Sequence, residues 1–208
     1  TEKHGKIVYE YDLIDQIWED RPALSEEPVF ALNLKYTGET VASKLSRIRE
    51  DMKKAGATAH VLTTLDDICW TLNIRGNDIE FFPLVLSYAV ITMDKVDLCI
   101  NEAKLSSEIK ADLEKDGVVF HPYNDIYEDI KKVGTDEVLL IDPARLNYAL
   151  YNNIPEGVAK VEERNPEILF KAIKNEVEIE NIRQAQIKDS VAHVKFMKWL
   201  KENVGKMT

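Results

Sequence analysis

An alternation of helical and strand-like patterns through the middle of the chain is the feature that most restricts its fold. In residues 41–54 apolar side chains recur at helical spacing, at Val41, Leu45, Ile48 and Met52. The next apolar run, 59–63, has the length of a strand, and helical and strand-like segments then follow one another to residue 161. Each such element must bury one face against another element. The pattern therefore predicts a three-layer α/β domain, with helices on both faces of a mixed sheet of about six strands.

Short apolar runs between turn residues place the other strands. Residues 84–92 and 96–100 flank a three-residue turn, Met93 to Lys95, which predicts a hairpin within the sheet. The run 138–141 is continuously apolar, as in a strand that is buried on both faces. Strands are also expected at 118–120 and 158–161, and helices at 106–115, 126–133 and 145–151.

The last forty residues follow a different pattern. From Pro166 to Lys201 the sequence is almost continuously helix-permissive, and acidic residues precede basic ones in the order that suits a helix dipole. We therefore expect one long helix. Its apolar residues form no single stripe, so they need a partner beyond a domain of this size. Asn165 marks the end of the domain, because a residue that precedes proline is disfavoured in a helix.

The segment 65–88, LDDICWTLNIRGNDIEFFPLVLSY, combines an aromatic ring, an amide, a guanidinium and a glycine turn in what we expect to be one short loop. Two interpretations remain open for Trp70, Asn73 and Arg75. In the structural one, Trp70 is a core anchor, Asn73 closes a turn, and Arg75 pairs with Asp67 or Asp78. In the functional one, the guanidinium binds a carboxylate or phosphate in a bidentate manner beside Trp70 as an apolar wall.

This segment resembles the I-x-W-x-x-N-x-R-G-x-D-x-x-x-x-P signature of the middle domain of three-domain Xaa-Pro aminopeptidases, the aminopeptidase P branch of the creatinase and prolidase superfamily. Residues 174–189, KNEVEIENIRQAQIKD, resemble the opening of the pita-bread catalytic domain of the same enzymes. Residues 14–52 resemble the linker and first helix of their middle domain. The resemblance thus covers essentially the whole chain in colinear order.

The resemblance implies a domain organisation. Residues 1–33 would be a linker from a preceding domain, 34–165 a creatinase/prolidase N-terminal-like α/β domain, and 166–208 the first helix of a truncated catalytic domain. The parent enzyme would remove an N-terminal residue that precedes proline, using two divalent metals, usually manganese, whose ligands lie further downstream. This chain would then be non-catalytic, support oligomerisation and border the substrate cleft at Trp70, Asn73 and Arg75.

A second interpretation is a peptide- or histone-binding module of a pita-bread protein that has lost its metals. The net charge of −10 would attract basic peptides, and it argues against nucleic acid and anionic membranes as partners. The two cysteines, Cys69 and Cys99, lack metal-ligand spacing and suit reduced thiols in the cytoplasm. Besides the rest of its own catalytic domain, we expect a homodimer, because apolar residues of the last helix would otherwise stay unburied.

The residues themselves predict no catalytic or metal site in this chain. Its four histidines fall in different expected elements, without the spacing of helical metal sites. Asp66 with Asp67, and Asp78 with Glu80, could pair as acid and base, but we expect a helix N-terminal charge and solvated turn residues instead. The run 81–83, Phe-Phe-Pro, is expected to pack into the core where a strand begins.

Overall fold

The computed structural model describes residue 11, residues 13–14 and residues 16–206 of the chain. Of the expected linker 1–33, residues 1–10, 12 and 15 lie outside the described residues. The centre of the molecule is the expected mixed sheet of six strands, in the order β6-β5-β4-β2-β7-β8. These strands are β2 (Ala59–Leu62), β4 (Ser87–Thr92), β5 (Val96–Ile100), β6 (Val118–His121), β7 (Val138–Ile141) and β8 (Ala159–Glu162).

Strand β4 is the exception to the direction of the sheet. It pairs antiparallel with both β2 and β5, whereas β5 with β6, β2 with β7, and β7 with β8 are parallel pairs. The expected hairpin of β4 and β5 is confirmed, with Ile91 opposite Val96. Because every strand except β4 runs the same way, the carboxyl ends of β2, β7 and β8 meet at one edge of the sheet.

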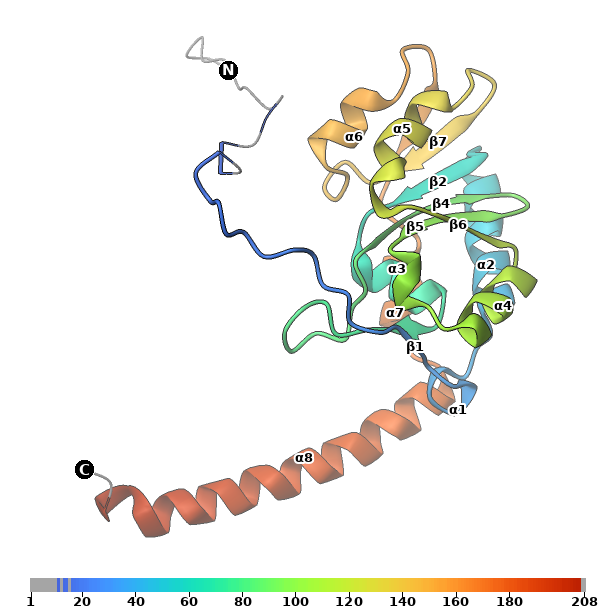
Figure 1. Cartoon of the computed structure of the whole chain (residues 1–208). Coiled ribbons are helices and arrows are strands. Elements are labelled where there is room, and N and C mark those ends of the chain that lie inside the picture. The colour runs from blue at the N-terminus through green and yellow to red at the C-terminus, as the bar shows by residue number, and fades with distance from the viewer. Residues whose placement is uncertain (1–10, 12, 15, 207–208) are drawn as a thin grey trace, which may run out of the picture.

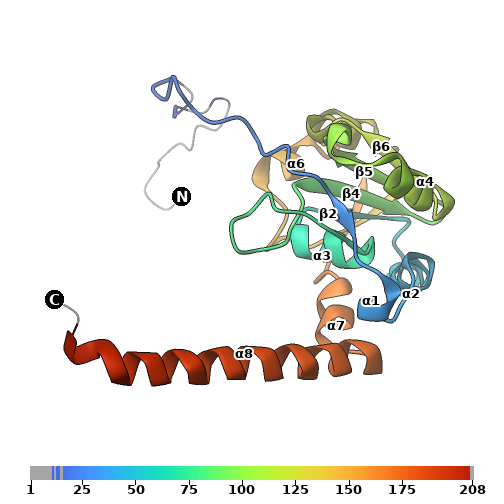
Figure 2. The same cartoon turned by 60° about the horizontal axis from the view of Figure 1, so that its bottom comes forward.

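Helices cover both faces, as predicted (Figures 1 and 2). On one face α2 (Val41–Lys54), α3 (Leu65–Thr71) and α4 (Ser107–Lys115) enclose a core with Leu62, Ile91 and Leu98. On the other face α5 (Ile126–Asp129) and α6 (Tyr148–Asn153) enclose a smaller core with Val61 and Ile141. This division follows from strand geometry, since successive side chains of a strand point to opposite faces.

Several boundaries differ from the sequence-based expectation. Helices α2 and α4 begin as predicted, because the hydroxyls of Thr40 and Ser106 accept a hydrogen bond from the backbone three residues on. By contrast β4 begins at Ser87 rather than residue 84, and α6 begins at Tyr148, capped by Asn147, rather than at residue 145. The expected helix 126–133 is α5 followed by a short 3-10 turn, Ile130–Lys132.

A small sheet outside the main one holds the beginning of the domain. Strand β1 (Phe30–Ala31) pairs antiparallel with β3 (Ile74–Arg75), and Val29 is buried in the core. The chain then forms the single turn α1 (Leu34–Thr37) before α2. Residues close to the end of the expected linker are therefore ordered against the segment that carries Arg75.

The expected long C-terminal helix is confirmed as α8, but residues 166–201 form two helices rather than one. The short α7 (Glu167–Ala172) contacts α3, and α8 (Glu176–Asn203) begins after a break and extends away from the domain (Figures 1 and 2). A capping box at Asn175 and Glu178 starts α8. Asn175 also donates to the carbonyl of Thr37 over 2.7 Å. A Cβ on Gly38 would lie 2.5 Å from Asn175 Oδ1, so glycine allows α1 and α8 to approach this closely.

Candidate functional site

The segment 65–88 is not one loop. Its first seven residues form α3, with Asp66 and Asp67 in the first turn, where negative charge is favourable. Trp70 lies on this helix and is buried, Asn73 follows it in a left-handed conformation with φ of 51°, and Arg75 lies on β3. The three candidate residues therefore come from a helix, a turn and a strand that the chain brings together within six positions.

Lys44 organises the surroundings of Trp70 and Asn73. Its ammonium group donates to the carbonyl of Trp70 and to Asn73 Oδ1, each over 2.7 Å, and lies 4.2 Å from the centre of the Trp70 ring. Asn73 Nδ2 in turn donates to the carbonyl of Glu39. Burial lowers the pKa of Lys44 from 10.5 to about 8, although Glu39 opposes this shift. Trp70 and Asn73 are thus engaged inside the domain.

Arg75 does not form either ion pair expected from the sequence. Its Nη1 donates to the carbonyls of Cys69 and Ile74, each over 2.7 Å, and burial lowers its pKa. Within the described residues, Asp67 contacts Lys171 and Asp78 contacts Lys104 instead. In this part of the chain both hydrogen bonds of Arg75 use one nitrogen, so the guanidinium keeps donors for a further acceptor.

A groove of about 570 Å³ separates α3 and β3 from α8. Trp70 and Arg75 line it on the domain side, and Glu178 and Ile182 line it on the side of α8. Its other charged lining residues are Asp66, Lys171, Lys174 and Lys188. With more basic than acidic side chains, this groove departs from the net negative charge of the whole chain, and its local charge suits an acidic or carboxylate-bearing partner.

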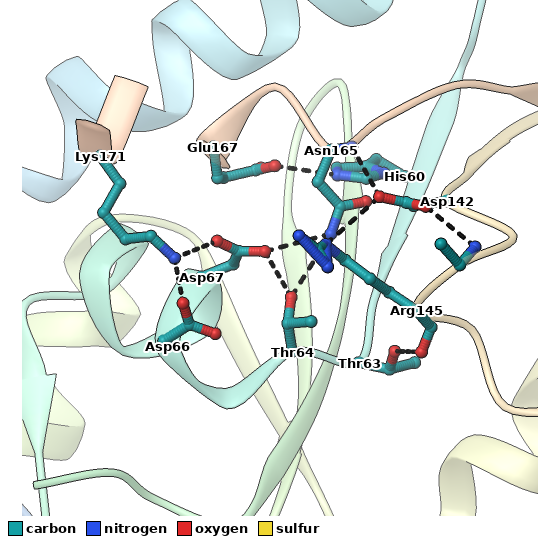
Figure 3. A network of polar contacts seen from close by, with 11 residues as sticks. His60, Thr63, Thr64, Asp66, Asp67, Asp142, Arg145, Asn165, Glu167 and Lys171 are labelled. Carbon is teal, nitrogen blue, oxygen red and sulfur yellow. Dashed lines mark hydrogen bonds and ion pairs between the residues drawn. The ribbon is translucent and has the colours of Figure 1, made fainter. Parts of the chain in front are cut away.

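A buried polar network joins α3 to the carboxyl edge of the sheet (Figure 3). Asp67 accepts hydrogen bonds from Thr64, from Asn165 over 3.1 Å and from Lys171 over 2.6 Å. Burial opposes ionisation of Asp67, but these donors outweigh it and lower its pKa. Asp142, at the end of β7, accepts from the backbone of Asn165 and contacts Arg145. The network therefore holds Asn165 and Lys171 of α7 against α3 and the end of β7.

A second buried pair lies beside it. His60 on β2 and Glu167 on α7 are fully buried, with 3.2 Å between His60 Nε2 and Glu167 Oε2 (Figure 3). The other ring nitrogen lies 3.0 Å from the carbonyl of Leu140, which accepts, so His60 Nδ1 carries a proton. Burial lowers the pKa of His60, but Glu167 outweighs it and the pKa is raised.

Sequence reasoning missed most of these residues, although two left a visible signal. Lys44 falls on the buried face of α2, between Val41 and Leu45, and His60 lies inside an apolar four-residue strand. A polar residue in an apolar pattern indicates a satisfied buried group. The expected helix N-terminal charge is confirmed for Asp66 and Asp67, which lie in the first turn of α3. The expectation of a solvated turn residue is wrong for Asp78, whose side chain is completely inaccessible.

The described residues also bear on metal binding, membrane crossing and thiol chemistry. No group of three or more His, Cys, Asp or Glu side chains in this part of the chain comes together in the way a metal ion needs. Likewise, none of its helices is long and apolar enough to cross a membrane. Both cysteines are buried free thiols with raised pKa values, chiefly because of burial.

The domain has three layers and an antiparallel β4, and the chain leaves it through α7. These features define an α/β domain of the creatinase/prolidase N-terminal type. Comparison with known proteins agrees with this class. The chain belongs to the creatinase/prolidase N-terminal domain family, whose model matches residues 20–178.

The relatives of the chain are named as aminopeptidases. A probable Xaa-Pro aminopeptidase P of Neurospora crassa is 35% identical over 216 residues, which cover 97% of this chain and 31% of that protein. Xaa-Pro aminopeptidase 1 of Dictyostelium discoideum is 38% identical over 214 residues, which cover 98% of this chain and 34% of that protein. The chain thus spans about a third of the length of the curated relatives it matches.

Solved structures agree on the fold. The crystal structure of the X-prolyl aminopeptidase of Caenorhabditis elegans, described as a cytosolic enzyme with a di-nuclear active site, matches with a TM-score of 0.88 and 34% identity. That match covers 94% of this chain and 33% of the enzyme. An Xaa-Pro dipeptidase of Bacillus anthracis, 19% identical over 76% of this chain and 44% of its own, shares the fold with a TM-score of 0.56.

Proposed function

We propose that this chain is a non-catalytic part of a metal-dependent Xaa-Pro aminopeptidase, an enzyme that removes an N-terminal residue preceding proline. The observation that carries the proposal is the match to the C. elegans enzyme, which covers 94% of this chain and therefore at least part of the 28-residue α8. The relatives named above carry aminopeptidase names and lend no support to the alternative of a histone-binding module.

The chemistry of the reaction belongs, in this proposal, to residues beyond this chain. The C. elegans relative is described as having a di-nuclear active site. We assign the parent enzyme two divalent metals, with manganese as the expected ion. The described residues hold no cluster suited to either metal, so no catalytic step is assigned to them.

The proposed division of the chain follows the same reasoning. Residues 1–33 connect from a preceding domain, 34–165 form the α/β domain, and 166–208 begin the catalytic domain. The packing of α7 on α3 and the exposed apolar residues of α8 support a role in joining the catalytic part to this domain. We also propose a homodimeric, cytoplasmic parent enzyme that acts on peptides.

Within this scheme, the groove between α3 and α8 borders the substrate cleft. Arg75 is the residue best placed to contact a ligand, because it lines the groove and keeps unused donors, whereas Asn73 is held by Lys44. Trp70 is mostly buried and packs against Lys44, so it does not offer an exposed apolar surface to a ligand.

The proposal is tested by comparing two purified proteins. The complete protein, loaded with manganese, is expected to release the first residue of an Xaa-Pro peptide, and this 208-residue chain is expected to release none. Hydrolysis by the 208-residue chain, or a complete protein that binds two metals and leaves Xaa-Pro peptides intact, would contradict the assignment.

A further inference from the structure

The segment between β3 and β4 carries an exposed aromatic tip. Residues 77–83, here called the Phe81 loop, project from the domain on the side toward which α8 extends, in both views (Figures 1 and 2). Phe81 is 91% exposed and Phe82 is 63% exposed. The expectation that these two rings pack into the core is therefore wrong.

The loop is ordered by its own backbone. Phe82 N donates to the carbonyl of Ile79 over 3.1 Å, and Leu84 N donates to that of Phe82 over 2.7 Å. A Cβ on Gly76 would lie 2.8 Å from Val85, so the two ends of the loop approach closely only because residue 76 is glycine. These contacts give the tip a defined shape.

A buried ion pair fixes the base of the loop. The side chains of Asp78 and Lys104 contact each other with at most 1% of either exposed, and Asp78 also accepts a hydrogen bond from the backbone of Leu86 over 2.7 Å. Removing two charges from water at the base of a surface loop is costly. Because the ion pair is present in spite of this cost, we infer that it holds the base of the loop in one fixed position.

Phe81 itself is strained. Its φ of 66° lies in the left-handed region, which bulky residues rarely occupy. Nothing in the described part of the chain buries the ring in return. Glycine or asparagine would adopt this backbone more easily, so the phenylalanine ring has to be explained by something it contacts outside these residues.

The shape and size of the tip decide what that contact is. The tip is convex, whereas sites for small ligands are concave, so Phe81 fits into a pocket rather than forming one. Burying an aromatic side chain removes about 150 to 250 Å². Two rings therefore supply about half of the roughly 800 Å² per partner that a stable complex between separate chains needs. A partner attached by the same chain needs far less area, because tethering raises its effective concentration.

We propose that Phe81 inserts into an apolar pocket of the polypeptide that follows α8 in the longer protein, and thereby fixes that part against this domain. The loop and α8 extend from the same side of the domain and both expose large apolar residues, so one body can cover both. The inference rests on the proposed function in one respect only, namely that such a following part exists.

Hydrogen exchange of the wild-type proteins gives the first test. Amides of residues 79–84 are expected to exchange at least about tenfold more slowly in the longer protein than in the 208-residue chain, which corresponds to about 1.4 kcal/mol. Equal exchange rates would overturn the proposal. Protection that rises with the concentration of the 208-residue chain would also overturn it, since the partner would then be a second copy.

Substitution gives the second test, with an expected difference between the two proteins. Phe81→Asn suits the left-handed backbone, so the melting temperature of the 208-residue chain is expected to stay the same or rise. In the longer protein the same variant is expected to lose the protection of residues 79–84, whereas Glu80→Ala, beside it at the tip, keeps it. Retained protection in Phe81→Asn refutes the docking role.

The outcome for docking is separable from the outcome for activity. A longer protein that protects the loop but hydrolyses no Xaa-Pro peptide overturns the proposed function and supports the docking of Phe81. An active protein with an unprotected loop overturns the docking of Phe81 alone.

Discussion

Replacing Lys44 with methionine tests the account of the site most directly. Lys44 is 1% exposed and its pKa is lowered from 10.5 to about 8. At about 1.4 kcal/mol per pH unit, the charged form is therefore destabilised by about 3 kcal/mol relative to the unfolded chain. Methionine fills a similar volume without a charge.

Two opposing terms set the stability of Lys44→Met at pH 7. The substitution removes the destabilisation of about 3 kcal/mol, but it leaves the carbonyl of Trp70 and Asn73 Oδ1 without their donor. Each buried group without a partner costs about 1 to 3 kcal/mol. These terms nearly cancel, so we expect the variant to lie within about 2 kcal/mol of the wild type at pH 7.

The pH dependence separates the two terms. Between pH 8 and 10.5 the unfolded chain retains the lysine proton that the folded chain has released, so this residue makes the wild type more stable as pH rises. Lys44→Met lacks this contribution. The free energy of unfolding of the wild type, relative to that of the variant, is therefore expected to rise by about 2 to 3 kcal/mol from pH 7 to pH 10.

Urea denaturation followed by far-ultraviolet circular dichroism at four pH values measures this difference. The buried thiols and other groups that titrate above pH 8 are common to both proteins and cancel in the comparison. Lys53→Met, at an exposed position of the same helix, serves as the control and should show no growth. A difference for Lys44→Met that stays constant from pH 7 to pH 10 would refute the reasoning.

Three further predictions concern the residues around the groove and the two C-terminal helices. In the complete enzyme, Arg75→Ala should raise KM for Xaa-Pro peptides about tenfold or more, as expected for loss of a charge-assisted hydrogen bond, with metal content unchanged; unchanged kinetics with lower stability would support a purely structural role. Because Glu167 raises the pKa of His60, the charged pair stabilises the fold, and this contribution is complete below the unfolded pKa of 6.5. The contribution is lost as pH rises through the folded pKa. Glu167→Gln should therefore lower the free energy of unfolding, measured by urea denaturation, by about 3 kcal/mol at pH 6 and by less at higher pH. An equal cost at both pH values would contradict that linkage. Asn175→Ala removes the capping box and should lower stability by about 1 kcal/mol and speed amide exchange in the first turn of α8, while Asn203→Ala at the other end should leave that turn unchanged.

Local patterns were sufficient to predict the sheet and most of its helices. The apolar periodicity of residues 41–52, the hairpin turn at Met93 to Lys95 and the continuous run 138–141 each depend on neighbours in sequence, and the structure has α2, the β4–β5 pair and β7 at these places. Thr40 and Ser106, which cap α2 and α4, lie at the start of these helical patterns, so the beginning of both helices was open to prediction from local sequence.

The polar contacts of the site depend on partners far apart in the chain. Asp67 meets Lys171, and His60 meets Glu167, across about a hundred residues, and single-sequence patterns contain no such pairing. The break before α8 was open to prediction, since Asn175 and Glu178 have the spacing of a capping box. The exposure of Phe81 was not, because an aromatic pair before a proline has the composition of a core segment.

Because α8 is long, the position of its far end depends strongly on the direction in which it leaves the domain. At about 1.5 Å per residue, its 28 residues reach about 42 Å, so a change of about 10° in its direction moves its far end by about 7 Å. The bonds from Asn175 to Thr37 and from Asn181 to Lys35 set that direction within the first turns. A small change in these two amide contacts therefore becomes a large displacement at the far end of the helix, where we propose that the next part of the protein attaches.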